Sequence, residues 1–166
     1  MIPKVLKNFN LFVDGKGYAG LVEDLTLPKL SVKMDELYTG GMDAPIDLEM
    51  GMDKLECDFS LCEYNTDVIH QFGLRNGAQV KLSLRGGLDG ETGVTPVVVT
   101  LTGAWKDIDM GNWKAGEKPS LKVNVTLRYY KLTVEGNDLV EVDVQNMVRK
   151  INGVDQLESM RSAIGL

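Results

Sequence analysis

Hydrophobic and polar residues alternate along most of this chain with a period of two. Asn8 to Val13, Lys54 to Cys62 and Val80 to Arg85 each place their apolar side chains on one face, and the longest alternating run spans 121–134. Such alternation is typical of half-buried β-strands. The pattern therefore predicts a mainly β protein.

Turn-forming residues divide the alternating runs. Asp14 to Gly17 predicts a turn that makes Tyr18 to Val22 a hairpin partner of the first strand. Pro28 cannot donate a backbone hydrogen bond, so we expect a sheet edge or a bulge there. The segments 86–93 and 109–119 are rich in glycine and polar residues, and we interpret both as long loops.

Helix signals are few and lie near two points of the chain. Thr66 is placed to cap a short helix over 67–72, and Asp155 to cap a C-terminal helix over about 155–164. A chain of 166 residues without a linker or repeat fits one domain. We expect a single domain over 1–166, a β-sandwich or partly open barrel with one or two short peripheral α-helices.

Charge is concentrated in one acidic segment. The net charge is -6, yet residues 35–58 hold eight carboxylates and a single basic residue, Lys54, so the rest of the chain is nearly neutral. An acidic balance disfavours a conventional nucleic-acid-binding protein. The segment also contains glycines and flexible methionines, which suit adaptable contact surfaces. We therefore predict a long extended loop, or arm, over about 38–58.

A glycine motif near the N-terminus has a more ordinary interpretation. Gly15 to Gly20 matches G-x-G-x-x-G, but the dinucleotide motif requires a helix after the glycines. The continuation from Leu21 to Pro28 alternates like a strand. We interpret the glycines as a hairpin turn.

Catalytic and metal-binding patterns are weak. His70 is the single histidine, and no nucleophile elbow accompanies it. Cys57 and Cys62 should point to opposite faces of one strand, Cys57 toward the core, so they cannot supply a zinc site with His70. We predict no catalytic residue, no metal and no cofactor; a hydrolase that uses Asp107 and Asp109 remains a distant alternative.

Two tryptophans leave a second alternative open. Trp105 and Trp113 flank a polar stretch and could form a stacking platform for sugars. A monomeric, carbohydrate-binding β-sandwich would follow from that arrangement. Core anchoring of Trp105, and loop packing or a subunit contact for Trp113, is the simpler interpretation.

Several short stretches, taken in order, carry a resemblance that covers 2–166. They are Leu27-Pro28-Lys29-Leu30, Gly40-Gly41-Met42-Asp43-Ala44-Pro45-Ile46, Trp113-Lys114-Ala115-Gly116-Glu117-Lys118, Tyr129-Tyr130-Lys131-Leu132, Ile151-Asn152-Gly153-Val154-Asp155-Gln156-Leu157 and the terminal Ile164-Gly165-Leu166. In this order and at this length, the chain resembles the major tail tube proteins of contractile-tailed temperate phages and the similar tubes of R-type pyocins.

The resemblance implies a structural protein without enzymatic activity. It implies stacked hexameric rings in which each subunit adds strands to a shared β-barrel, surrounded by a sheath and joined to baseplate, tail terminator and tape-measure proteins. The tube would cross the target envelope and conduct DNA in a phage or ions in a bacteriocin. A tube protein of a type VI secretion system is the nearest rival.

The resemblance also implies where subunits meet. The long loop would reach the adjacent ring, and both termini would make contacts. The expected contact residues are Ile2, Tyr38, Gly40, Gly41, Met42, Asp43, Ala44, Pro45, Met50, Met52, Trp113 and Leu166.

Acidic side chains suggest a further hypothesis, because DNA slides past a lumen that repels it. Asp43, Asp47 and Glu49 are expected either to line the lumen or to pair with basic groups at subunit contacts. The start of the chain lacks the apolar core of a signal peptide, so we expect assembly in the host cytoplasm and residence in a virion tail or bacteriocin particle.

Overall fold

A computed structural model describes residues 1–73 and 77–166. Its described elements are almost all strands. In chain order they are β1 (Val5–Val13), β2 (Lys16–Gly17), β3 (Val22–Thr26), β4 (Val32–Leu37), β5 (Ile46–Met52), β6 (Glu56–Leu61), α1 (Thr66–His70), β7 (Val80–Gly90), β8 (Gly93–Asp109), β9 (Leu121–Val134), β10 (Asn137–Asp143), β11 (Val148–Ile151), β12 (Val154–Asp155) and α2 (Glu158–Ala163).

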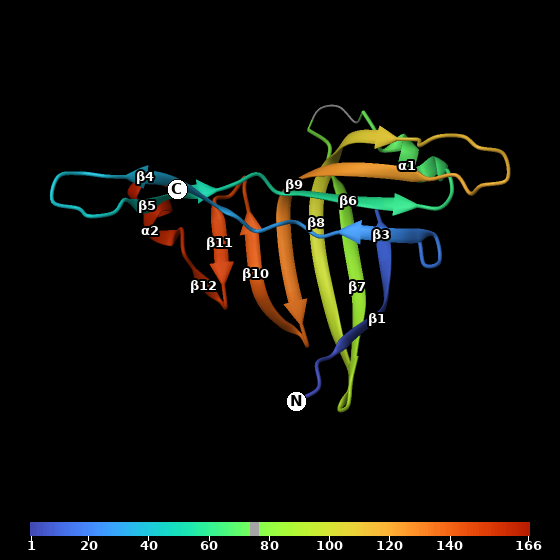
Figure 1. Cartoon of the computed structure of the whole chain (residues 1–166), viewed down its shortest axis with the longest axis horizontal. Helices are drawn as coiled ribbons and strands as arrows, with labels where there is room; N and C mark the ends of the chain where they lie inside the picture. The colour runs from blue at the N-terminus through green and yellow to red at the C-terminus, as the bar shows by residue number, and fades with distance from the viewer. Residues whose placement is uncertain (74–76) are drawn as a thin grey trace.

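One large antiparallel sheet dominates the molecule (Figure 1). Its strand order is β12-β11-β10-β9-β8-β7-β1-β2, so the chain mostly pairs each strand with its sequence neighbour. The strand register puts Leu11, Leu84, Val99, Leu132 and Val140 in one row across one face. That face is the core side, and the period-two pattern had predicted it.

The sheet divides at β9. The first half of β9 pairs with β6, which pairs with β3, whereas its second half pairs with β10. β8 follows β9 through this bend with register shifts at Thr102/Gly103 and Trp105/Asp107. Gly103 is required there, because a Cβ would lie 2.2 Å from the carbonyl oxygen of Thr126. The bend lays a second layer of strands across the upper part of the large sheet (Figure 1).

The core lies between these two layers. Phe59, Leu101, Leu121 and Val123 are fully buried, and Trp105 packs edge-to-face on Phe59 with ring centroids 5.6 Å apart. Cys57 is buried with Leu55 and Leu61, as its predicted face required.

The predicted fold class, a mainly β sandwich or partly open barrel with short helices, is confirmed. The chain is mainly β, carries two short helices, and its sheets are open within one subunit. In the described part of the chain, no helix has the length and apolar character needed to cross a membrane.

The expected loop over 38–58 is in fact interrupted by a strand, β5, and ends inside β6, which corrects the prediction. β4 and β5 form a separate two-stranded hairpin that projects from one end of the molecule, at the left of Figure 1. Residues 38–45 connect the two strands, and β6 begins at Glu56. The hairpin was hard to recognise in the sequence because its strands have almost no buried residues. Without a core face, apolar and polar residues need not alternate. We call the hairpin of residues 32–52 the arm.

Two helix caps also differ from expectation. Asn65, not Thr66, caps α1, and its side chain accepts a hydrogen bond from the Val68 amide. α2 starts at Glu158 rather than near 155, and its N-cap residue Leu157 makes no side-chain cap bond. Asp155 instead belongs to β12 and accepts a hydrogen bond from the Leu157 amide, so it precedes the helix that it was expected to cap.

The two predicted loops have different outcomes. The segment 86–93 is mostly strand, because β7 continues to Gly90 and β8 begins at Gly93 in a tight hairpin. The segment 110–120 has no strand or helix and is a long loop, as predicted. Pro28 lies between β3 and β4, where it ends pairing rather than interrupting a strand.

Candidate assembly surfaces

The residues considered for chemistry do not converge. Gly15 follows the turn residue Asp14 between β1 and β2, as predicted, and His70 ends α1 on the surface. Within the described residues, no three His, Cys, Asp or Glu side chains form a group that could hold a metal ion. Asp107 accepts a hydrogen bond from the Asn124 amide group and Asp109 from the Gly111 backbone amide, so both serve local structure.

The two tryptophans do not form a common platform. Trp105 is buried and donates its indole N–H to the Val68 carbonyl at 2.7 Å. Trp113 lies in the 110–120 loop with 84% of its surface exposed. Its indole N–H donates to the Tyr64 hydroxyl at 2.7 Å, and that hydroxyl donates to the Met110 carbonyl at 2.6 Å. Trp113 is therefore a prepositioned, exposed aromatic side chain, the kind that anchors protein interfaces.

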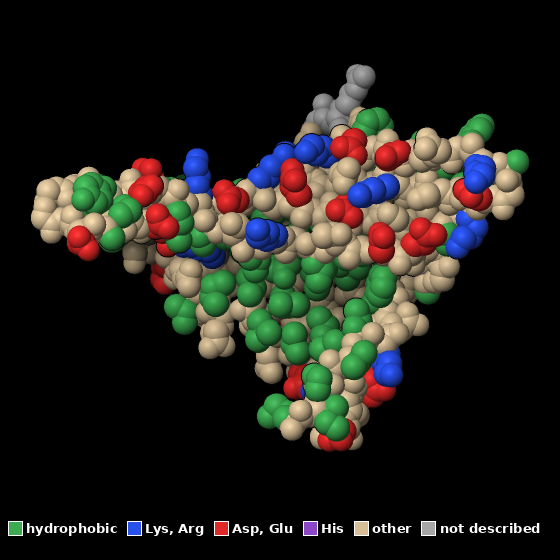
Figure 2. Space-filling model, viewed as in Figure 1, with side chains coloured by type: hydrophobic (Ala, Val, Ile, Leu, Met, Phe, Trp, Pro, Cys, Tyr) green, Lys and Arg blue, Asp and Glu red, His purple; other side chains and the backbone are tan. Residues whose placement is uncertain are grey.

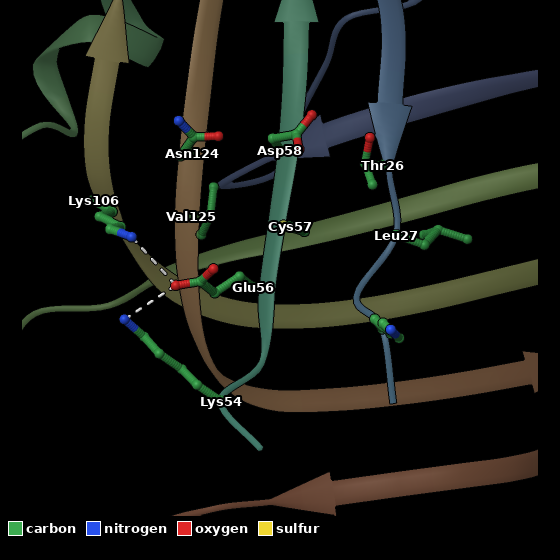
Figure 3. A pocket seen from close by; sticks show the side chains of 10 residues that line it. Thr26, Leu27, Lys54, Glu56, Cys57, Asp58, Lys106, Asn124 and Val125 are labelled. Carbon is green, nitrogen blue, oxygen red and sulfur yellow. Dashed lines mark hydrogen bonds and ion pairs between the residues drawn. The ribbon is translucent and has the colours of Figure 1, made fainter. Parts of the chain in front are cut away.

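A cavity of about 430 Å³ opens on the outer side of the second layer (Figure 3). Glu56 lies at its edge, 3.1 Å from the Lys54 ammonium and 3.4 Å from that of Lys106. The hydrogen bond from Lys54, helped by the charge of Lys106, lowers the pKa of Glu56. Burial raises the pKa of the neighbouring Cys57 thiol to about 12. A carboxylate held ionised cannot act as a general acid, and a thiol held protonated is a poor nucleophile near neutral pH.

The arm carries most of the predicted contact residues. β5 contains Met50 and Met52. The tip of the arm contains seven more, namely Tyr38, Gly40, Gly41, Met42, Asp43, Ala44 and Pro45. All are exposed except Met42, which is partly buried, and Met52, which lies half-buried at the base of the arm and packs against the core cluster. Apolar side chains are exposed on both strands, as with Met34, Ile46 and Leu48. An isolated two-stranded hairpin with such exposed side chains is marginally stable alone.

The three acidic residues singled out from the sequence have different environments on the arm. Asp43 lies in the tip. Asp47 lies directly opposite Glu36 in the strand register, and like charges at such positions repel. Glu49 is different, because its carboxylate accepts a hydrogen bond from the guanidinium of Arg149 on β11. Among the residues that the structure describes, Asp43 and Asp47 therefore have no ion pair, and Glu49 has one within the subunit.

Apart from Trp113 in its loop, the remaining predicted contacts lie at the chain ends. Ile2 precedes β1 and Leu166 follows α2, and both are exposed. In Figure 1 the N-terminus lies beside the lower end of the large sheet, far from the tip of the arm, and the C-terminus is drawn over the base of the arm. The contact residues therefore form several separate surfaces rather than one.

An apolar groove was missed from the sequence. The second layer covers only the upper part of the large sheet, and hydrophobic side chains remain visible below it (Figure 2). They surround a hollow of about 370 Å³ whose lining is almost wholly apolar, including Leu6, Phe9, Leu27, Leu88, Leu132 and Val134. The alternation placed Phe9 on the same face as Leu11 and Val13, but sequence could not reveal that the covering layer stops short. A large exposed apolar face marks an interaction site.

The opposite face of the large sheet is polar. Ser83, Thr100, Lys131, Glu141 and Lys150 form one row across it in the strand register. Acidic and basic side chains alternate along this row, so the face carries mixed charge. It contrasts with the acidic arm.

The outer edge of β1 is the other unpartnered feature. β2 pairs with β1 only at Phe12 and Val13, and in the described chain the stretch from Val5 to Leu11 has a strand partner on one side alone. An exposed edge of this length presents backbone donors and acceptors to another strand.

Comparison with known proteins identifies the family. The model of the family "Phage tail tube protein FII" matches residues 3–165. The tail tube protein of Escherichia phage P2 is 38% identical over 170 residues, covering 99% of both chains. The major tail tube protein of Serratia phage KSP20 is 29% identical over 168 residues, covering 99% of this chain and 98% of the relative.

Solved structures of contractile injection systems share the fold. A chain from the PVC sheath/tube terminator has a TM-score of 0.63 at 8% identity, covering 80% of this chain and 98% of that one. A chain from the PVC sheath-tube complex has a TM-score of 0.61 at 8% identity, with coverages of 79% and 91%. A chain from the anti-feeding prophage baseplate has a TM-score of 0.54 at 14% identity, with coverages of 80% and 97%. Fold and sequence agree: this chain belongs to the phage tail tube protein family and is a structural subunit of the inner tube of a contractile tail.

Proposed function

We propose that this tube subunit works by closing into homo-hexameric rings that stack inside a contractile sheath. The observation that carries the proposal is the open large sheet with one polar face, one apolar face and an unpaired β1 edge. An open sheet with a free edge can be continued by the sheet of the next subunit, and six copies then close a shared barrel without edges. The family resemblance supports the number six.

The polar face of the large sheet is the surface we assign to the lumen. Side chains such as Ser83, Thr100 and Lys131 keep it hydrated, and the mixture of charges along the row presents no continuous basic surface to DNA. The acidic residues Asp43, Asp47 and Glu49 lie on the arm, away from this row. We therefore favour the second of the two expected roles, at contacts between subunits, for Asp43 and Asp47, whereas Glu49 pairs with Arg149 of its own subunit.

The remaining surfaces are then available for contacts. The arm would reach the adjacent ring, a second copy would cover the apolar groove, and the exposed Trp113 would anchor a contact at the other end of the molecule. The partners we propose are further copies of the chain, the sheath, the baseplate, the tail terminator and the tape-measure protein. The particle would assemble in the host cytoplasm, and the tube would conduct DNA in a phage or ions in a bacteriocin.

Electron microscopy of the purified chain tests the assembly. Size-exclusion chromatography followed by negative staining should show hollow rings or tubes with sixfold symmetry. A chain that stays monomeric at high concentration, even when baseplate and tape-measure partners are added, would overturn the proposal. A ring of another symmetry would retain the tube and correct the subunit number.

A further inference from the structure

A mostly buried arginine of the body pairs with a half-exposed carboxylate near the base of the arm. Arg149 lies on the core-side face of β11, opposite Val142 of β10, and its side chain is 11% exposed. Its guanidinium donates to the Glu49 carboxylate of β5, one hundred residues away in the sequence. In the described chain, Glu49 is the one carboxylate that pairs with Arg149, and the buried Nε of Arg149 has no hydrogen-bond partner.

Little else fixes the direction of the arm. β4 and β5 pair with each other and with no further strand in the described chain. Every residue of β4 is exposed, and in β5 only Met52 is partly buried. The backbone bond from Asp53 N to Ser31 O, 2.8 Å long, closes the base of the hairpin but does not join it to the body.

The packing around this base is loose. Cavities of about 250 Å³ and 320 Å³ open beside it, and both are lined by Met52 and Arg149. Gly51 in β5 has φ +98°, a conformation that side chains disfavour. The strand register also shifts between Val32 and Met34. Unfilled space and an irregular hairpin base leave room for the arm to swing.

Arg149 is itself rigidly held. Its carbonyl accepts a hydrogen bond of 2.8 Å from the Gln156 amide, and its strand pairs with β10 on the other side. A buried guanidinium without a carboxylate is strongly unfavourable, so the ion pair favours the one arm direction that brings Glu49 within reach.

We propose that Arg149 is the positioning residue of the arm, and that its ion pair with Glu49 presets the direction in which the arm leaves the subunit. The inference rests on the proposed role of the arm in subunit contacts. A preset arm loses less conformational freedom when the next subunit binds. The Glu49–Arg149 ion pair, which we call the latch, therefore speeds assembly without touching the partner. If loss of the latch leaves the arm in the competent direction one tenth of the time, association weakens about tenfold.

The test measures the arm in the free subunit. Spin labels are placed on Ala44→Cys at the tip and Lys122→Cys on the body, in a Cys62→Ser background where the buried Cys57 stays unlabelled. The labelled monomer fraction should give a narrow distance distribution, which Glu49→Gln should broaden. Asp47→Asn is the matched control. It also removes one negative charge from β5, two residues from Glu49, but Asp47 makes no ion pair with any residue that the structure describes.

Assembly and rescue complete the experiment. Glu49→Gln should slow tube formation about tenfold and Asp47→Asn much less, while the exchanged pair Glu49→Arg with Arg149→Glu should restore a narrow distribution. An unchanged distribution in Glu49→Gln, or equal broadening in both variants, would overturn the latch. Failure of the wild-type chain to form tubes would overturn the proposed function instead, since the distance measurement does not depend on assembly.

Discussion

Single residues show how closely the interior of this subunit is specified. Trp105 fills the core beside Phe59 and satisfies the Val68 carbonyl at the start of α1, whereas Trp113 contacts only the loop and Tyr64. The same residue type is therefore buried at one position and exposed at the other, where we propose a subunit contact. A matched pair of substitutions separates the two roles.

We predict that Trp105→Phe lowers the free energy of unfolding by about 2 kcal/mol, because it removes the indole hydrogen bond to the Val68 carbonyl and opens a cavity in the core. Trp113→Phe should change it by less than about 0.5 kcal/mol, since Trp113 is exposed. Urea unfolding followed by circular dichroism measures both. Equal losses in the two variants would contradict the assignment of Trp113 to the surface of the subunit.

The carboxylate of Asp155 provides a second residue-scale prediction. The hydrogen bond from Arg161 lowers the pKa of Asp155 below its ordinary value of 3.8, and Arg161 also donates to the Met147 carbonyl at 2.8 Å. A depressed pKa contributes stability above the unfolded value, which is lost as the pH falls through the folded value. The helical chemical shifts of α2 should therefore persist down to pH 3.8 and disappear only below it.

Carboxyl NMR titration of Asp155 checks this order of events. Its midpoint should lie below 3.8 in the wild-type chain and move upward in Arg161→Met. α2 has no buried residue, so the ion pair is its principal attachment to β12. If the titration midpoint of Asp155 does not move in Arg161→Met, a group other than Arg161 lowers the pKa of Asp155, and the prediction is wrong.

At the scale of elements, the bend of the β8–β9 hairpin separates the two layers. We predict that Gly103→Ala lowers the free energy of unfolding by about 3 kcal/mol, because its Cβ would overlap the Thr126 carbonyl and force the strands apart. Gly40→Ala is the control, since its Cβ would meet no atom within 4 Å. Thermal unfolding of both variants measures the difference; a tolerated Gly103→Ala would mean that the bend adapts.

Sequence patterns predicted the strands with a buried face and failed where no such face exists. The alternation from Lys54 to Cys62 and over 121–134 matches β6 and β9 closely. β5 fell inside the predicted loop because it lies outside the core and its polar residues do not alternate cleanly with apolar ones. A hairpin without a buried face leaves little alternation in the sequence.

The candidate site was predictable to a similar extent. Local glycine and methionine content located the arm, but the Glu49–Arg149 ion pair joins residues far apart in the sequence. The apolar groove likewise depends on where β3 and β6 end above the large sheet, which is a property of the three-dimensional arrangement. Pairings over such separations have no local pattern from which to predict them.

At the scale of the whole molecule, the two faces of the large sheet imply a direction for the tube wall. The polar row through Thr100 would face inward, and the second layer, whose outer side carries Asp24 of β3, would face outward. A covering layer on one side and solvent on the other is what a tube wall requires, because its inner surface must stay wet and its outer surface must meet protein.

Cysteine accessibility in assembled tubes tests this direction. In a Cys62→Ser background, Asp24→Cys should react with both a small maleimide and a maleimide carrying a large polyethylene glycol chain. Thr100→Cys should react with the small reagent and resist the large one, because a narrow lumen excludes the polymer while admitting small solutes. The free subunits serve as the control, since both cysteines should accept both reagents before assembly. Rapid modification of Thr100→Cys by the large reagent in intact tubes would reverse the wall and place the polar face outside.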